Sequence, residues 1–322
     1  MAILVTGAAG FIGYHTVEAL LARGDEVIGI DNLNAYYDVS LKEARLRQLE
    51  GKPGFQFRKM DIADGKAMAA LRDAPIDHII HLAAQAGVRY SIDEPLAYAA
   101  SNLVGQTEIL ELARHRKVAH CVYASSSSIY GRNSAIPFSE SDRTDTPASF
   151  YGATKKSGEL LADSYASLYA LRLTGLRFFT VYGPWGRPDM AYMIFTKKIL
   201  AGEPIEVFGQ GDMGRDFTYI DDCVQGILGA LDHPPGASGD DVPHRVFNLG
   251  NDKPERLMSL ISSIEEHLGA TATKQMKPMQ PGDVRETWAN IGKARELIGY
   301  DPMTSLKEGL GRFVEWYRSY YS

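Results

Sequence analysis

Short apolar runs alternate with longer amphipathic segments through the first half of the chain. The runs are typical of buried strands and cover residues 3–5, 27–30, 55–57, 79–82 and 121–123. Apolar residues at helical spacing fill several of the intervals, most clearly over residues 103–113. Because repeated strand–helix alternation favours βαβ units, we predict an α/β fold of the Rossmann type with a doubly wound parallel sheet.

The pattern changes after about residue 179. Glycines and prolines become denser, and clear helical spacing returns only over residues 306–317. We expect residues 1–179 to form a nucleotide-binding domain and residues 180–322 a smaller α/β substrate-binding domain. The segment of about 220–250 is expected to return to the first domain. A ligand is then expected in the cleft between the two domains.

Composition is that of an ordinary globular protein and argues against several other classes. The chain has 322 residues, of which 45% are hydrophobic and 23% charged, and its formal net charge is -6. The negative charge argues against nucleic acid or an anionic membrane as the main partner. No apolar run reaches the ~18 residues that a membrane helix needs, and the N-terminus lacks the basic segment of a signal peptide. We therefore expect a cytoplasmic protein.

Cysteine and histidine usage indicates neither disulfides nor a metal. Cys121 and Cys223 are the only cysteines, and they stand in separate contexts. The eight histidines lack the spacing of metal ligands. We predict no metal site.

A glycine-rich turn follows the first predicted strand and precedes a helical pattern. Its glycines have the spacing G-x-x-G-x-x-G. Glycines allow the backbone to approach a pyrophosphate, and a helix N-terminus adds free N–H donors and the positive end of its dipole. The motif alone is a weak signal, but this position predicts a dinucleotide site formed by Gly7, Gly10, Phe11, Ile12 and Gly13.

Acidic residues end or follow the next two predicted strands. Asp31 is placed to bind the adenosine ribose hydroxyls, and its carboxylate would repel a 2′-phosphate. Its neighbours Asn32 and Leu33 are uncharged, so we predict NAD rather than NADP as the cofactor. Asp61 and Ile62 are placed to border the adenine, although an ordinary turn aspartate explains Asp61 equally well.

Two further patterns carry candidate chemistry. Tyr151 and Lys155 are four residues apart and share one face of a predicted helix. A nearby ammonium lowers the pKa of a tyrosine from ~10, which makes Tyr151 a candidate base. Four serines, residues 125–128, follow the fifth predicted strand. Taken separately, the first pattern indicates a surface helix and the second a polar loop.

Together, the glycine turn, the serine run and Y-x-x-x-K resemble the extended short-chain dehydrogenase/reductase family. The resemblance covers nearly the whole chain, including the segments 81–84, 215–219 and 281–284. Within the family, residues 31–42 and 177–191 are most similar to the bacterial UDP-glucuronate 4-epimerase group. The resemblance implies an NAD-dependent isomerase of polysaccharide biosynthesis. It would interconvert UDP-glucuronate and UDP-galacturonate through a 4-keto intermediate.

The resemblance also implies roles for individual residues. The catalytic set falls on Tyr151, Lys155 and Ser126, and Lys155 is expected to contact the nicotinamide ribose as well. Further cofactor positions fall on Leu82, Ala83, Ala84 and Asn102. Substrate contacts fall on Arg215 for the UDP phosphates, Asp283 for the uridine ribose, Arg187 for the carboxylate and Arg89 for the sugar or a phosphate. A structural ion pair explains Arg215, and a solvated loop explains Arg187, nearly as well.

Hydroxyl groups are expected to surround C6 of the sugar. Related 4,6-dehydratases and decarboxylases carry carboxylic residues after the catalytic serine, where this chain has Ser127 and Ser128. Hydroxyls do not repel a uronate, and Thr180 is a compact donor where UDP-galactose 4-epimerases present an asparagine. We interpret Ser127, Ser128 and Thr180 as a cradle for the carboxylate. The alternative is that the two serines only satisfy loop backbone groups.

Rival functions stay open. They are an epimerase for UDP-glucose or its N-acetyl analogue, a UDP-glucuronate decarboxylase, and a non-catalytic NAD-binding protein. The last commonly lacks the tyrosine or the lysine, and both are present here. Residues 103–113 and 160–168 match helices that pair as a four-helix bundle in family dimers. A homodimer is therefore expected, although the sheet can also cover these apolar faces.

Overall fold

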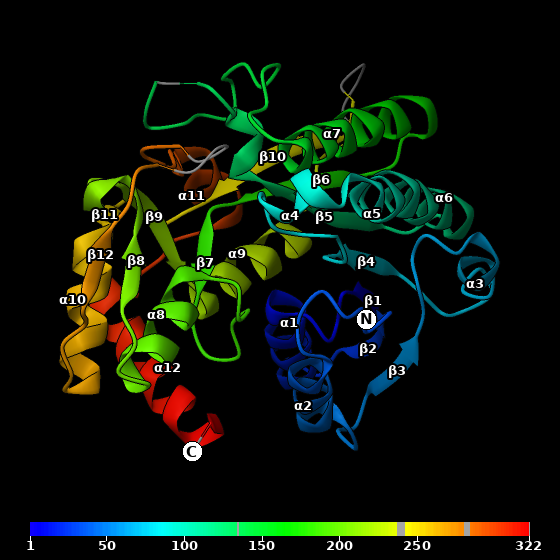
Figure 1. Ribbon diagram of the computed structural model, residues 1–322. Coiled ribbons are helices and arrows are strands. Elements are labelled where there is room, and N and C mark those ends of the chain that lie inside the picture. The colour runs from blue at the N-terminus through cyan, green and yellow to red at the C-terminus, as the bar shows by residue number, and fades with distance from the viewer. Residues whose placement is uncertain (134, 237–241, 280–283, 322) are drawn as a thin grey trace.

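The computed structural model describes residues 1–133, 135–236, 242–279 and 284–321. Within these residues, the largest element is a seven-stranded sheet of order β10-β6-β5-β4-β1-β2-β3 (Figure 1). Every neighbouring pair is parallel, which confirms the predicted Rossmann-type α/β fold. The strands are β1 (Ala2–Thr6), β2 (Glu26–Asp31), β3 (Phe55–Lys59), β4 (His78–His81), β5 (His120–Ser126), β6 (Leu173–Phe178) and β10 (His244–Leu249).

Helices cover both faces of this sheet. The helices that accompany the large sheet are α1 (Phe11–Ala22), α2 (Val39–Leu49), α3 (Gly65–Ala69), α4 (Tyr90–Asp93), α5 (Pro95–Ala99), α6 (Gln106–Arg116), α7 (Phe150–Tyr169) and α9 (Ile220–Asp232). In β1, Ile3 and Val5 belong to the core cluster shared with α1 and α9, whereas Leu4 belongs to the cluster shared with α6 and α7. Because successive side chains of a strand point to opposite faces, the unbroken apolar run of β1 reflects burial on both sides.

The remaining strands form two small sheets beside the large one (Figure 1). They are β7 (Thr180–Tyr182), β9 (Gly214–Tyr219) and β11 (Pro254–Arg256) in one sheet, and β8 (Ile205–Val207) and β12 (Lys274–Met276) in the other. The helices of this half are α8 (Ala191–Leu200), α10 (Leu257–Leu268), α11 (Gly292–Ile298) and α12 (Leu306–Tyr321). Phe313 of α12 packs edge-on against Tyr192 of α8, with ring centroids 4.8 Å apart.

The five strands expected from apolar runs are all present, and β5 continues further than its run indicated. It extends to Ser126, so two of the four serines belong to the strand. Ser127–Tyr130 then forms a 3-10 helix. The serine run is thus a strand end and a helical turn rather than a loop. On the other side of β6, β10 joins the same sheet, while the division of the chain at residue 179 stays a prediction.

Candidate active site

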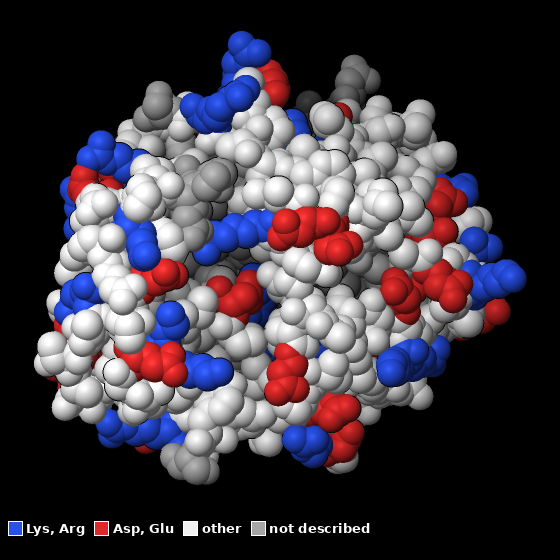
Figure 2. Space-filling view, in the orientation of Figure 1, with Lys and Arg blue, Asp and Glu red and all other residues white. Residues whose placement is uncertain are grey.

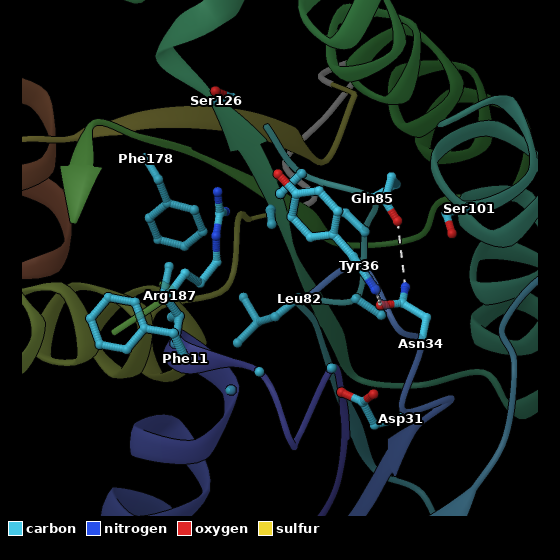
Figure 3. Close-up of a pocket in the computed structure, with 18 of the residues that line it drawn as sticks. Phe11, Asp31, Asn34, Tyr36, Leu82, Gln85, Ser101, Ser126, Phe178 and Arg187 are labelled. Atoms are coloured by element: carbon cyan, nitrogen blue, oxygen red, sulfur yellow. Dashed lines mark hydrogen bonds between the residues drawn. The ribbon is translucent and has the colours of Figure 1, made fainter. Parts of the chain in front are cut away.

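A cavity lies at the carboxyl ends of the strands of the large sheet (Figure 3). Asp31 ends β2, Ser126 ends β5 and Phe178 ends β6, and all three line the cavity. Parallel strands bring these ends to one edge, where ligands of open α/β sheets bind. Asp31 and Ser126 lie on opposite sides of the cavity. The predicted site residues that line it are Gly7, Gly10, Phe11, Ile12, Gly13, Asp31, Asn32, Ile62, Leu82, Ala83, Ala84, Ser126, Tyr151, Lys155 and Arg187.

The glycine turn closes tightly between β1 and α1. Gly7 has a φ of 74°, and a Cβ there would lie 2.8 Å from the backbone nitrogen of Ala83. A Cβ on Gly13 would collide with the carbonyl oxygen of Gly7. No described side chain caps α1 at Gly10, so the first N–H groups of the helix are left for another acceptor. This backbone fits the pyrophosphate of a dinucleotide such as NAD.

Asp31 is buried at the end of β2 and holds two backbone segments. Its Oδ2 accepts a hydrogen bond from the N–H of Ala9 at 3.2 Å, and its Oδ1 accepts one from the N–H of Leu33 at 2.8 Å. The carboxylate therefore lies directly beside the glycine turn. This position suits the ribose that follows a bound pyrophosphate, and it disfavours a 2′-phosphate.

Asp61 and Asn102 are not among the described residues that line the cavity. Asp61 accepts a hydrogen bond from Asn32 Nδ2 at 2.9 Å and one from the backbone of its own turn. Asn102 lies in a π-helical turn before α6, and its Nδ2 donates to the carbonyl oxygen of Gln85 and to Thr154 Oγ1, both at 3.0 Å. It thus ties the segment after β4 to α7 and supports the cavity wall from behind.

Tyr151, Lys155 and Ser126 meet where α7 passes the end of β5. Tyr151 lies in the first turn of α7, which begins after the N-cap Ser149. One turn later, Lys155 Nζ donates to the carbonyl oxygen of Ala124 at 2.9 Å, which fixes α7 against β5. The predicted catalytic residues therefore lie together, although β5 ends at Ser126 and α7 begins only at Phe150.

Burial governs the protonation of this constellation. It raises the pKa of Tyr151, while a hydrogen bond with Ser126 and the charge of Arg187 act in the opposite direction. Burial also lowers the pKa of Lys155 to about 8. The sequence pointed to Lys155 as the cation that activates Tyr151. That role of Lys155 stays a prediction.

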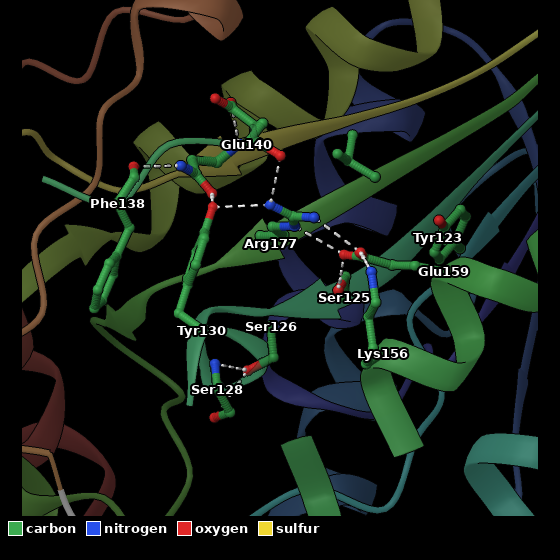
Figure 4. A network of polar contacts seen from close by, with 12 residues as sticks. Tyr123, Ser125, Ser126, Ser128, Tyr130, Phe138, Glu140, Lys156, Glu159 and Arg177 are labelled. Atoms are coloured by element: carbon green, nitrogen blue, oxygen red, sulfur yellow. Dashed lines mark hydrogen bonds and ion pairs between the residues drawn. The ribbon is translucent and has the colours of Figure 1, made fainter. Parts of the chain in front are cut away.

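A buried ion pair supports the serine segment (Figure 4). Arg177 in β6 binds both carboxylate oxygens of Glu159 in α7, each at 2.9 Å. Ser125 donates to Glu159 Oε1 at 2.7 Å, and Arg177 Nη1 donates to Tyr130 Oη at 2.9 Å. The network joins α7, which carries Tyr151, to Ser125 in β5 and to Tyr130 at the end of the 3-10 helix. Sequence reasoning missed it, since a charged residue at a buried position gives no indication of its partner.

The three hydroxyls expected around C6 belong to residues close to the cavity lining in the sequence. Ser126 Oγ accepts a hydrogen bond from the N–H of Ser128 and donates to Ser128 Oγ, both at 3.2 Å. Thr180 begins β7, between the lining residues Phe179 and Val181. Ser127, Ser128 and Thr180 are themselves absent from the described lining. Ser128 thus makes backbone and side-chain contacts within its own turn, as the alternative interpretation expects.

The candidate arginines differ in their contacts. Arg187 lines the cavity, and its Nε and Nη2 donate to Asp189 at 2.9 and 2.7 Å. Arg215 donates to two backbone carbonyl oxygens, and Arg89 lies over a phenylalanine ring at 5.5 Å from its centroid. Neither is in the described lining. Asp283 lies outside the described residues.

Several lining residues were not predicted. They come from the segment between β2 and α2, from α2 itself, from the segment after β4 and from the π-helical turn before α6, namely Asn34, Tyr36, Tyr37, Lys42, Gln85, Ala86 and Ser101. Residues 34–42 drew attention only through the family resemblance. Most of this stretch has no regular secondary structure, so periodicity gives no indication of which side chains face the cavity.

Charges of both signs are interspersed on the face shown in Figure 2, which is hollowed near its centre. Among the described residues, no group of three or more His, Cys, Asp and Glu side chains is arranged to hold a metal ion. In the same part of the chain, no helix combines the length and the apolar character required to cross a bilayer.

The fold and the site together define a class of protein. A parallel Rossmann sheet, a glycine turn beside Asp31, and Tyr151 and Lys155 on one helix characterise enzymes that bind a dinucleotide for hydride chemistry. The chain belongs to the NAD dependent epimerase/dehydratase family, whose model matches residues 3–250.

Similar proteins narrow the class. UDP-glucuronate 4-epimerase 1 of Arabidopsis thaliana is 49% identical over 333 residues, which cover 100% of this chain and 77% of the relative. The crystal structure of UDP-glucuronic acid 4-epimerase from Bacillus cereus, in complex with UDP-glucuronic acid and NAD, has a TM-score of 0.91 and 38% identity, with 100% of both chains covered. UDP-glucose 4-epimerase from Thermotoga maritima has a TM-score of 0.87 and 33% identity, again with 100% of both chains covered.

Proposed function

We propose that the protein is an NAD-dependent 4-epimerase that interconverts UDP-glucuronate and UDP-galacturonate. One observation carries the proposal: Asp31 is the sole acidic residue among the described lining residues, and it lies on the opposite side of the cavity from Ser126. Ser126, Tyr151 and Arg187 contribute hydroxyls and a positive charge to the cavity instead. This environment suits a sugar with a carboxylate and lacks an acid for dehydration. Similarity to the Arabidopsis and Bacillus epimerases supports the same substrate.

The residues of the site divide the chemistry between them. When bound, NAD supplies a hydride acceptor and donor for C4 of the sugar. The glycine turn and Asp31 hold its pyrophosphate and ribose, and Lys155 is placed for the nicotinamide ribose. Tyr151 removes the proton from the C4 hydroxyl as the alcohol becomes a ketone, and returns it later. The 4-keto sugar must turn its other face to the same residues, so Tyr151 and Ser126 serve both faces.

A uronate substrate can lose its carboxylate as CO2 during the reaction, and we assign the prevention of this loss to hydroxyl groups near Ser126. Its 4-keto form is a β-keto acid, which loses CO2 most readily when the C5–C6 bond lies perpendicular to the carbonyl plane. The protein must therefore hold the carboxylate away from that geometry. We assign this role to Ser127, Ser128 and Thr180, with Arg187 as the nearby cation. Asp189 already neutralises part of the charge of Arg187. Arg187 therefore attracts the substrate carboxylate less strongly than an unpaired arginine would.

The nucleotide part of the substrate is assigned to the second half of the chain and the rim of the cavity. Arg215 is proposed for the UDP phosphates, because a guanidinium matches phosphate geometry. Asp283 is proposed for the uridine ribose and Arg89 for the sugar or a phosphate. These three assignments depend on the family resemblance and not on the described lining.

A substrate comparison tests the proposal against its rivals. Purified protein is incubated without added cofactor with UDP-glucuronate, UDP-glucose, UDP-N-acetylglucosamine or UDP-galacturonate, and the products are separated by chromatography. We expect interconversion of the two uronates and release of NAD when the protein is denatured. Turnover confined to the neutral sugars would support the UDP-glucose alternative, and a UDP-pentose as the main product would support a decarboxylase.

We also propose a homodimer formed through α6 and α7. Val104 in the π-helical turn before α6 is 50% exposed, and Leu160 and Leu168 of α7 are 59% and 68% exposed. A largely apolar groove lies between α7 and this turn with the start of α6. A second copy of the chain would bury this surface as a four-helix bundle. Light scattering after gel filtration tests it. Leu160→Glu should convert the dimer to a monomer, whereas Leu297→Glu, at another exposed leucine, should not.

A cytoplasmic location is part of the proposal as well. Cys121 and Cys223 are both buried free thiols, which is typical of a reducing compartment. Localisation of a fluorescent fusion, with a secreted control, tests this assignment.

A further inference from the structure

Arg45 of α2 is a fully buried guanidinium that spans two separate segments. Its Nη1 donates to the carbonyl oxygen of Ala9 at 2.9 Å. Its Nε and Nη2 donate to the carbonyl oxygen of Trp185 at 3.1 and 2.6 Å, and Nη2 also reaches that of Gly186 at 3.3 Å. Ala9 belongs to the glycine turn, and Gly186 directly precedes Arg187. One side chain therefore connects the cofactor turn to the segment that carries the cavity arginine.

Within the described part of the chain, the hydrogen bonds of Arg45 go to neutral oxygens only. Besides the three carbonyl groups, it donates to Tyr37 Oη at 2.8 Å. A buried charge without a counter-ion is unfavourable. The glycine turn that Arg45 holds is the place where the structure fits a pyrophosphate, so a bound dinucleotide would bring negative charge to the far side of the same peptide. Cofactor binding and the position of Arg45 are therefore electrostatically linked.

Two more side chains from the first 50 residues, which include the glycine turn, contact the segment 184–189. His15 of α1 forms a hydrogen bond with the carbonyl oxygen of Pro184 at 3.0 Å. Tyr36, which lines the cavity, donates to Asp189 Oδ2 at 3.1 Å, and Asp189 in turn binds Arg187. The segment 184–189 is thus bound by residues of the first 50 at its start (Pro184), its middle (Trp185 and Gly186) and its end (Asp189).

We propose that Arg45 is a positioning residue that couples the glycine turn to the segment 184–189. A cofactor at the turn then orders the segment that presents Arg187, and the ordered segment in turn strengthens binding of the cofactor, because such coupling is reciprocal. The link to catalysis depends on the proposed function, in which Arg187 meets the carboxylate. The coupling itself does not depend on the identity of the sugar.

Arg45→Lys is the discriminating variant. Lysine keeps the positive charge but offers a point donor, so it cannot bind Ala9 and Trp185 together as the guanidinium fork does. Arg23→Lys is the matched control, since Arg23 is only partly buried and binds Asp25 and Asp232 rather than the segment. Both proteins are compared with the parent holoenzyme at saturating NAD by hydrogen–deuterium exchange and mass spectrometry.

We expect peptides covering residues 183–190 to exchange at least about fivefold faster in Arg45→Lys, while peptides of α7 and the large sheet remain unchanged. NAD should dissociate at least about fivefold faster from the same variant. Arg23→Lys should match the parent in both measurements. Unchanged exchange over 183–190 would overturn the coupling. Faster exchange spread over the whole sheet would overturn it too, because Arg45 would then only stabilise the fold.

A kinetic comparison links the coupling to the carboxylate. In Arg45→Lys, KM for UDP-glucuronate should rise by about fivefold or more with a smaller change in kcat, and KM for any neutral UDP-sugar that is turned over should stay constant. An equal change for both substrates would contradict the path through Arg187. Absence of all turnover in the parent would overturn the proposed function but leave the exchange experiment valid.

Discussion

Glu159 of α7 and Arg177 of β6 form a buried two-point ion pair, with both N–O distances at 2.9 Å. The pair lies two turns beyond Tyr151 on the same helix and beside the serine segment (Figure 4). The pair holds α7 against β6, and the hydrogen bond from Ser125 to Glu159 extends this contact to β5, the strand that carries Ser126.

Glu159→Gln should destabilise the protein by about 3–5 kcal/mol, because it leaves the Arg177 guanidinium buried without its counter-ion. Denaturant unfolding measures the change. Lys156→Gln is the control, since Lys156 approaches the same carboxylate only at 3.9 Å from the surface and should cost less than about 1 kcal/mol. Equal effects of the two substitutions would show that the buried pair does not hold α7 in place.

Tyr151→Phe should reduce epimerisation by roughly 10²–10⁴, since it removes the proton acceptor and little volume. NAD should stay bound to the variant. Tyr98→Phe is a matched control, because its ring lies 6.0 Å from that of Tyr151 but its hydroxyl donates to backbone carbonyl oxygens. It should lose about 1 kcal/mol of stability and keep turnover within about tenfold. Near-normal turnover of Tyr151→Phe would remove this residue from the mechanism.

Asp31→Ala should weaken retention of NAD, because it removes the expected ribose contacts and the hydrogen bond to the N–H of Ala9. The cofactor released by denaturing equal amounts of purified variant and parent is measured by absorbance. Asp61→Ala should retain more NAD than Asp31→Ala, since Asp61 is not in the described lining. Equal occupancy of Asp31→Ala and parent would mean that Asp31 is not the ribose ligand.

Lys155→Met should stabilise the NAD-free protein at pH 7 while it abolishes activity. Burial lowers the pKa of Lys155 from 10.5 to about 8, which corresponds to at most about 3 kcal/mol of unfavourable burial. Below pH 8 the lysine is charged in the folded and unfolded states. Between pH 8 and 10.5 the folded state loses its proton first, so the parent gains stability as pH rises. The difference in unfolding free energy between Lys155→Met and the parent should therefore shrink from pH 8 to pH 10.5, as measured by denaturant unfolding at several pH values. A constant or growing advantage would contradict the lowered pKa.

The sequence was sufficient for features that depend on local patterns. The strands were visible as apolar runs, and the glycine turn was visible because close backbone packing at Gly7 and Gly13 demands glycine. The helical spacing of Tyr151 and Lys155 also placed both in the cavity. Sequence resemblance extended this to NAD and to the epimerase family.

Long-range contacts of charged residues could not be predicted in this way. Arg45 and Glu159 lie in helices whose patterns give no sign that their charges are buried, and their partners lie far along the chain. The same reason explains why the sequence did not point to Arg187, 36 residues beyond Tyr151, as a charge that opposes the rise in the pKa of Tyr151. The positions of Ser127, Ser128 and Thr180 depend on where β5 ends and where β7 begins, which periodicity does not specify.

Ser127→Ala and Thr180→Val should each reduce kcat/KM for UDP-glucuronate by about tenfold or more, because hydrogen bonds to a charged group contribute ~1.5–3 kcal/mol. A loosened carboxylate should also let the β-keto acid lose CO2. Mass spectrometry of the products should therefore reveal a UDP-4-keto-pentose beside UDP-galacturonate. An unchanged rate without this product, in both variants and in Ser128→Ala, would reduce the role of these hydroxyls to satisfying their own turn.

The fate of the hydrogen at C4 tests the central claim most directly. UDP-glucuronate that carries deuterium at C4 is incubated with purified protein in ordinary water without added NAD, and the product is analysed by NMR. A 4-epimerase that uses tightly bound NAD in both directions should yield UDP-galacturonate with the deuterium retained at C4 and the configuration inverted. Formation of UDP-galacturonate with loss of the deuterium to water, or absence of UDP-galacturonate altogether, would contradict the account.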